Sequence, residues 1–65
     1  MREWLVATRK SKDLTQADVA KLAGITQPAL CNIEQGIGLR PATAKKIAAV
    51  LGVDWTRFYD DDEGK

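Results

Sequence analysis

Apolar residues recur at helical spacing along almost the whole of this 65-residue chain, and no segment alternates apolar and polar residues with a period of two. This pattern predicts helices and no strands. A chain of this length forms one domain, and folding buries only about 60% of the surface that the unfolded chain exposes. The predicted fold class is therefore all-α, with several short helices around one small core.

Residues that favour helix ends divide the chain into five helical segments. Thr15 is followed three residues later by Asp18, which is the spacing of a capping box. Gly24 and Gly52 can adopt the left-handed conformation that ends a helix. We predict a first helix over about residues 2–11, a second capped by Thr15 and ended by Gly24, a third capped by Thr26 and running over about 27–35, a fourth from Pro41 to Gly52, and a last one capped by Asp54 that carries Trp55, Phe58 and Tyr59.

The predicted core consists of the apolar residues that share one face of each helix. Residues three or four positions apart lie on the same side of a helix, so their side chains can enter a common interior. The predicted buried residues are Val19, Ala20, Leu22 and Ala23 in the second helix, Leu30 and Ile33 in the third, and Ala44, Ile47, Ala48 and Leu51 in the fourth.

The composition excludes several classes of protein. The chain has no His and only one Cys, Cys31, so it offers neither an internal disulfide nor a usual zinc ligand set. It contains no plausible nucleophile–base pair and no glycine-rich phosphate loop after a strand, so we expect no enzyme activity, no cofactor and no metal. No apolar run approaches the about 18 residues of a membrane span, and the N-terminal apolar stretch is too short for a signal peptide. We therefore expect a cytoplasmic protein without membrane contact.

Charge is segregated along the chain, although the formal net charge is only +1. Residues 60–65 contain four acidic residues and one basic residue, which leaves nine basic and five acidic residues, a charge of +4, over residues 1–59. We expect a folded domain over 1–59 and a disordered acidic tail over 60–65. A mildly basic domain fits binding to a polyanion, but it also fits an ordinary solvated surface.

The two helices on either side of Gly24 carry most of the functional information. A short helix, a tight turn with glycine and a second short helix form a helix-turn-helix unit. This geometry leaves one face of the third helix free to enter the major groove of DNA.

Several segments, in order and at matching spacing, resemble the lambda-repressor/Cro-like (XRE-type) helix-turn-helix domain. Residues 14–27, LTQADVAKLAGITQ, resemble its opening, residues 30–36, LCNIEQG, its recognition helix and closing turn, and residues 43–53, TAKKIAAVLGV, its fourth helix. Residues 54–59, DWTRFY, resemble the ending of small phage-type regulators. The resemblance covers residues 5–59 and implies a five-helix lambda-repressor-like bundle. It also implies a sequence-specific transcriptional regulator of double-stranded DNA, a repressor.

The third helix presents a polar stripe opposite Leu30 and Ile33. Gln and Asn amides can each donate to and accept from adenine in the major groove, whereas proline can only touch apolar edges such as a thymine methyl group. Cys31 is a small residue that would allow close approach to the DNA. The predicted base contacts are Gln27, Pro28, Cys31 and Asn32. The alternative is that these are ordinary solvated residues.

Phosphate contacts are expected where backbone N–H groups are exposed at the starts of the second and third helices. The resemblance implies that the Gln16 amide bonds a phosphate oxygen while it braces Gln27, and that Arg40 contacts the DNA backbone. It also implies that Glu34 is structural and pairs with Arg9 of the first helix. The predicted phosphate contacts are Thr15, Gln16, Thr26 and Arg40. The alternative is that Gln16 is an ordinary residue of the first helical turn and Arg40 an exposed charge.

Residues 26–35 contain no Lys or Arg, which suggests a modest affinity for each protomer. A homodimer on a palindromic operator would double the contacts, with half-sites about 34 Å apart. The predicted dimer interface comprises Ile37, Leu39, Trp55 and Tyr59. Alternatively, Trp55 and Phe58 cap the core against Trp4.

A second function is compatible with the same fold. The weakly basic third helix, the aromatic ending and the acidic tail also fit a protein-interaction module, such as an antitoxin or a regulator of another repressor. In that case a protein, rather than DNA, would be the partner. Replacing Gln27 and Asn32 by Ala discriminates between the two, because only specific DNA binding should be lost.

Overall fold

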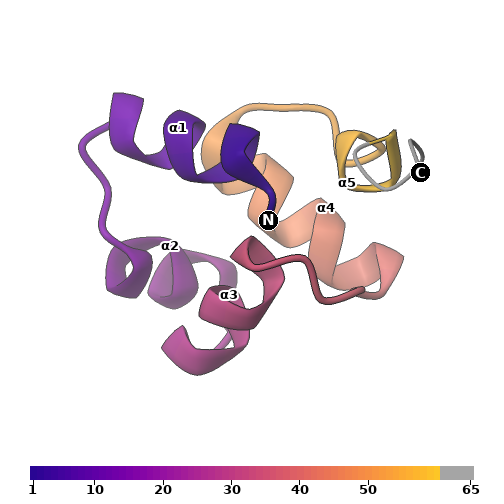
Figure 1. Ribbon diagram of the computed structural model, residues 1–65. Helices are drawn as coiled ribbons and strands as arrows, with labels where there is room; N and C mark the ends of the chain where they lie inside the picture. The colour runs from indigo at the N-terminus through magenta and orange to yellow at the C-terminus, as the bar shows by residue number, and fades with distance from the viewer. Residues whose placement is uncertain (61–65) are drawn as a thin grey trace.

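Five helices and no strand make up residues 1–60, the part of the chain that the computed structural model describes (Figure 1). The helices are α1 (Glu3–Ser11), α2 (Gln16–Ala23), α3 (Gln27–Glu34), α4 (Pro41–Leu51) and α5 (Arg57–Asp60). The predicted all-α, five-helix architecture is therefore confirmed. The predicted disorder of the acidic tail concerns residues 60–65, of which Asp60 ends α5 and residues 61–65 lie outside the described residues.

The helix-turn-helix pair forms one side of the bundle. In Figure 1, α2 and α3 lie together below α1, while α4 and α5 complete the other side. Helix α2 packs against both α3 and α4, and α1 contacts α3. This arrangement leaves α2 and α3 next to each other with their outer sides free of other helices.

The helix ends follow the local signals in the sequence. The Thr15 hydroxyl accepts a hydrogen bond from the Asp18 backbone N–H at 3.1 Å, and the Asp18 carboxylate accepts one from the Thr15 N–H at 3.0 Å, so the predicted capping box is formed. The Thr15 backbone N–H, together with the Thr15 hydroxyl, holds the pKa of the Asp18 carboxyl below its ordinary value. Gly24 and Gly52 end α2 and α4 with φ of +74° and +71°, the left-handed conformation that glycine adopts without strain.

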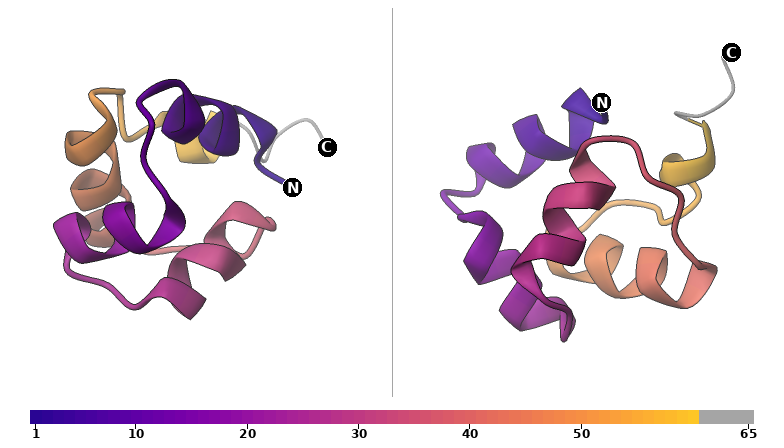
Figure 2. Two further views of the ribbon diagram at one scale, coloured as in Figure 1. Left: turned by 90° about the vertical axis from the view of Figure 1, so that its left-hand side faces the viewer. Right: turned by 60° about the horizontal axis from the view of Figure 1, so that its bottom comes forward.

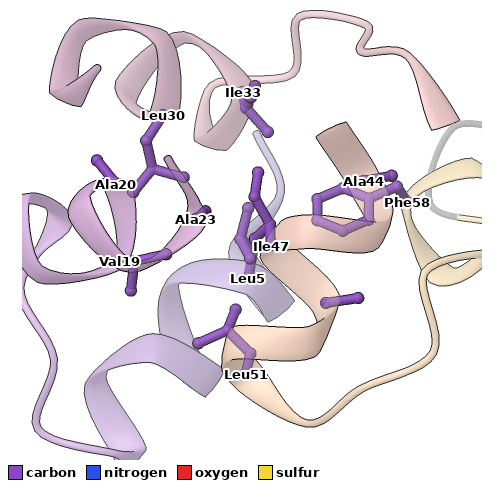
Figure 3. Packing of buried hydrophobic residues seen from close by; sticks show 11 residues of the cluster. Leu5, Val19, Ala20, Ala23, Leu30, Ile33, Ala44, Ile47, Leu51 and Phe58 are labelled. Atoms are coloured by element: carbon purple, nitrogen blue, oxygen red, sulfur yellow. The ribbon is translucent and has the colours of Figure 1, made fainter. Parts of the chain in front are cut away.

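One hydrophobic core joins all five helices, and its side chains converge between them in Figure 3. Phe58 of α5 is fully buried and meets the Trp4 ring edge-on, with ring centroids 5.0 Å apart. The expectation that Phe58 caps the core against Trp4 is therefore correct. The buried residues are Leu5, Val19, Ala20, Ala23, Leu30, Ile33, Ala44, Ile47, Ala48, Leu51 and Phe58.

Two features differ from the sequence-based expectations. Leu22 was expected in the core, but it is 64% exposed. It lies about 60° round the helix from Val19, on the side away from Ala20, so it misses the interior. Helix α5 begins only at Arg57, because the Asp54 carboxylate accepts hydrogen bonds from the N–H and hydroxyl of Thr56 and closes a turn before the helix.

Candidate nucleic-acid interface

The turn between α2 and α3 is three residues long and is fixed by hydrogen bonds at both of its ends. The Ile25 N–H donates to the Ala20 carbonyl at 2.9 Å and ties the turn to α2. The Thr26 hydroxyl accepts from the Ala29 N–H at 3.2 Å and caps α3, with a proline in its first turn as predicted. These short-range contacts fix where α2 ends and where α3 begins.

The inner side of α3 is held by apolar packing and by a buried ion pair. Leu30 and Ile33 enter the core, and Glu34 is 2% exposed. The Arg9 Nε donates to the Glu34 carboxylate at 2.7 Å, which confirms the pairing that the family resemblance implied. Arg9 also donates to the Leu14 carbonyl at 3.0 Å, so it joins α1, the following loop and α3.

Gln16 completes this ion pair rather than bracing Gln27. Its Nε2 donates to the Glu34 carboxylate at 2.8 Å, so the expected contact with Gln27 is wrong. A side-chain amide has two N–H groups, and the second can still donate to a ligand. Because Gln16 is the first residue of α2 and half-buried, it links the buried ion pair to the surface beside the turn.

The outer side of α3 carries the predicted base-reading residues. Gln27, Pro28 and Asn32 are exposed, and Cys31 is half-buried. The Gln35 amide lies beside the Cys31 sulfur, with Nε2 and Sγ 3.8 Å apart. When the lower side of Figure 1 is turned forward, as in the right view of Figure 2, α3 lies at the front of the molecule.

The predicted phosphate-binding threonines lie at the N-terminal ends of α2 and α3. Both Thr15 and Thr26 are exposed, and each hydroxyl accepts a backbone N–H. A hydroxyl that accepts one hydrogen bond still has its own hydrogen to donate. Both caps therefore stabilise their helices. The Thr26 hydroxyl keeps a donor at the surface, whereas the Thr15 hydroxyl also interacts with the Asp18 carboxylate.

A groove of about 360 Å³ runs between α3, the α3–α4 loop and α4. Asn32 lies on its α3 side, and Arg40 and Thr43 lie on its α4 side. Sequence reasoning placed Asn32 against bases and Arg40 against phosphate. The structure brings these two residues to the same groove, although they are separated by a loop in the sequence.

The residues predicted for a dimer interface come from the α3–α4 loop and from the C-terminal region. The Tyr59 hydroxyl donates to the Leu39 carbonyl at 2.9 Å, which joins the two segments. Ile37 and Tyr59 are 59% and 37% exposed. Trp55 is half-buried, with Tyr59 edge-on at 5.9 Å and the Lys45 ammonium 5.0 Å above its ring.

Arg2 is a structural residue at this site that sequence reasoning missed. It is 1% exposed, and its Nη1 donates to the carbonyls of Ile33 and Ile37 at 2.7 and 2.8 Å. No local signal could have found it, because these partners lie 31 and 35 residues further along the chain.

None of the helices among residues 1–60 is long and apolar enough to cross a membrane.

Two short helices joined by a three-residue turn, with the outer side of the second free, define the chain as a helix-turn-helix protein. The family described as helix-turn-helix matches residues 5–58. The chain belongs to this family, which is of the XRE type and consists of DNA-binding regulators rather than enzymes.

A bacterial relative covers almost the whole chain. The chain is 43% identical over 63 residues to YqaF of Bacillus subtilis (strain 168), an uncharacterized HTH-type transcriptional regulator. The alignment spans 94% of this chain and 82% of that protein. No solved structure is significantly similar to the chain.

Proposed function

We propose that this protein is a cytoplasmic transcriptional repressor that binds a specific operator in double-stranded DNA with α3 in the major groove. The observation that carries the proposal is the division of α3 into two sides. Leu30, Ile33 and Glu34 fix its inner side to the bundle, whereas Gln27 and Asn32 project amides from its exposed side. Amides at these positions can pair with the N6 and N7 atoms of adenine.

Phosphate contacts on both sides of α3 would hold the helix in register with the groove. Thr15 and Gln16 lie at the start of α2, Thr26 at the start of α3, and Arg40 at the start of α4. Backbone N–H groups at helix starts favour anions, and phosphate contacts fix register without reading sequence. The groove shared by Asn32 and Arg40 supports simultaneous contact with a base and with the neighbouring backbone.

A second copy of the chain would double these contacts and bring a second recognition helix to the operator. The surface proposed for it combines Ile37 and Leu39 of the loop with Trp55 and Tyr59. The exposure of Ile37 and the hydrogen bond between Tyr59 and Leu39 support it, because together they form one partly apolar surface. Ile37→Ser should shift sedimentation towards the monomer, alone or with operator, whereas Leu22→Ser removes an equally exposed apolar residue and should not.

Selection from a random duplex DNA library tests the proposed function. The selection is run at roughly physiological salt, because non-specific phosphate binding weakens steeply as salt rises. The expected result is a palindrome with half-sites about one helical turn, 34 Å, apart. Recovery of no motif by folded protein would refute direct sequence reading by this chain. It would favour the alternative in which the same fold binds a protein.

A further inference from the structure

Arg2 is the most deeply buried charged residue among residues 1–59, although it lies outside every helix. Its side chain reaches the C-terminal end of α3, where Nη1 donates to the Ile33 carbonyl at 2.7 Å and to the Ile37 carbonyl at 2.8 Å. Its backbone N–H donates to the Glu34 carbonyl at 2.8 Å. One residue near the start of the chain therefore contacts two carbonyls at the end of α3 and one in the loop that follows it. Figure 1 shows the N-terminus beside this end of α3.

The physical role of this contact follows from the chemistry of a helix end. The last carbonyls of a helix have no partners within the helix, and they carry the negative end of its dipole. Helix α3 has no basic residue in its own last turn. The Arg2 guanidinium supplies the missing positive charge through two charge-assisted hydrogen bonds.

The same guanidinium also determines where the chain goes after α3. Ile33 belongs to the helix, but Ile37 lies beyond it, after Gly36, which has φ of +114°. A single nitrogen that binds both carbonyls holds the α3–α4 loop at a set distance from the helix. That loop leads to Arg40, on the wall of the groove that Asn32 shares.

Arg2 is itself held in place from the side of α5. Its Cζ lies 5.6 Å from the centroid of the Phe58 ring, and Phe58 is fully buried. The other end of α1 provides Arg9, which binds the Glu34 carboxylate. Two arginines at opposite ends of α1 thus hold α3. Arg9 binds the Glu34 side chain of α3, and Arg2 binds the carbonyls at the end of α3.

We propose that Arg2 is a positioning residue for DNA recognition, which fixes the end of α3 and the α3–α4 loop so that Asn32 and Arg40 meet the DNA together. This inference rests on the proposed function. Arg2 is too deeply buried to contact DNA itself, so its effect passes through the carbonyls that it binds.

Replacement of Arg2 by Met and by Lys tests this role, because Met keeps much of the apolar stem and Lys keeps the charge. Leu51→Val is the control, since it trims a buried side chain of α4 away from the end of α3 and lowers stability without touching Arg2. All variants are measured at a temperature at which circular dichroism shows them to be folded. Two readouts are taken: affinity for the selected duplex, and the carbonyl carbon-13 shifts and amide hydrogen exchange of residues 33–38.

We expect Arg2→Met to move the carbonyl shifts of Ile33 and Ile37, to speed exchange in the loop, and to weaken operator binding about tenfold. Arg2→Lys should recover part of this affinity, and Leu51→Val should bind like the original protein. Unchanged affinity in Arg2→Met, or an equal loss in Leu51→Val, would overturn the proposal. If Arg2→Met does not fold, Arg2→Lys decides, because unchanged affinity and carbonyl shifts there would also overturn it. Failure of the unsubstituted protein to bind any duplex would instead refute the proposed function, and the carbonyl shifts would still show whether Arg2 holds the end of α3.

Discussion

The two sides of α3 differ in every physical respect although they belong to the same eight-residue helix. The inner side is buried, with Leu30 and Ile33 in the core, and it is tied to α1 and α2 by the bonds that Glu34 accepts from Arg9 and Gln16. The outer side is polar and exposed, with Gln27 and Asn32 in solvent. Substitutions on the inner side should therefore change stability, and substitutions on the outer side should change what the protein binds.

Helix α3 is oriented by contacts with other parts of this small domain. About eight residues of helix cannot hold a fixed direction by themselves, since isolated helices this short are marginal in water. The buried ion pair and the Arg2 contact provide this direction from outside the helix. The contacts of the inner side therefore fix the direction in which the outer side faces.

The largest effect on the inner side is expected from Glu34→Ala. It leaves the buried Arg9 guanidinium without its carboxylate and removes the acceptor of Gln16. Breaking a buried pair from one side costs about 3–5 kcal/mol, a large fraction of the stability of a small domain. Urea unfolding followed by circular dichroism measures it, with Glu3→Ala on the exposed first turn of α1 as the control. Equal stability of the two variants would show that the inner side does not depend on the ion pair.

On the outer side, the double variant Gln27→Ala and Asn32→Ala should lose discrimination between operator and unrelated DNA. Each well-formed amide–adenine pair contributes about 1–3 kcal/mol of discrimination, so the loss should reach about a hundredfold or more. Its free energy of unfolding should change by about 0.5 kcal/mol or less, because both residues are exposed. Fluorescence anisotropy with matched and scrambled duplexes measures the discrimination. Ser11→Ala, an exposed polar substitution at the end of α1, should leave it unchanged.

A smaller effect on the free energy of unfolding is expected at the N-terminal ends of α2 and α3, which Thr15 and Thr26 cap. Thr15→Ala removes one half of a capping box, whereas Thr26→Ala removes a single hydrogen bond. Loss of an N-cap costs about 1 kcal/mol, and Thr15→Ala should be the more damaging of the two. Thermal unfolding of both variants tests the order. Because the variant keeps the backbone N–H that donates to Asp18, the reverse order would mean that the Thr15 hydroxyl stabilises its helix less than the Thr26 hydroxyl does.

The smallest effect concerns acid stability. The Thr15 N–H and hydroxyl hold the pKa of Asp18 below its ordinary value of 3.8, so ionised Asp18 stabilises the folded state above that pH. This contribution is lost as pH falls through the lower folded-state pKa. Between about pH 4 and pH 2, Asp18→Asn should therefore lose less stability than the original protein. Identical pH profiles of unfolding would contradict the role of the capping box.

The local features of the fold could be predicted from the sequence because they depend on neighbouring residues. The Thr15 capping box, the left-handed Gly24 and Gly52, and the proline that opens α4 all act within a few residues of their own position. The exposed stripe of α3 followed from the spacing of Leu30 and Ile33. The pairing of Arg9 with Glu34 was accessible only through the family resemblance, because 25 residues separate the two.

The features that could not be predicted depend on how the helices pack. Leu22 has the composition of a core residue, but the direction from which α3 and α4 cover α2 leaves it outside. Gln16 was expected to brace Gln27, and only the packing of α2 against α3 shows why it meets Glu34 instead. The burial of Arg2 depends on the end of α3 and on Phe58 at once, and no sequence pattern marks such a site.

The most direct test of the central claim is a nuclear magnetic resonance titration of the labelled protein with the selected duplex, observing the side-chain amide signals. If the outer side of α3 reads the bases, the Gln27 and Asn32 amide signals should shift strongly on binding. The Trp4 indole signal, packed against Phe58 in the core, should move little. Binding that leaves the Gln27 and Asn32 amides unchanged while signals elsewhere on the surface shift would contradict the account.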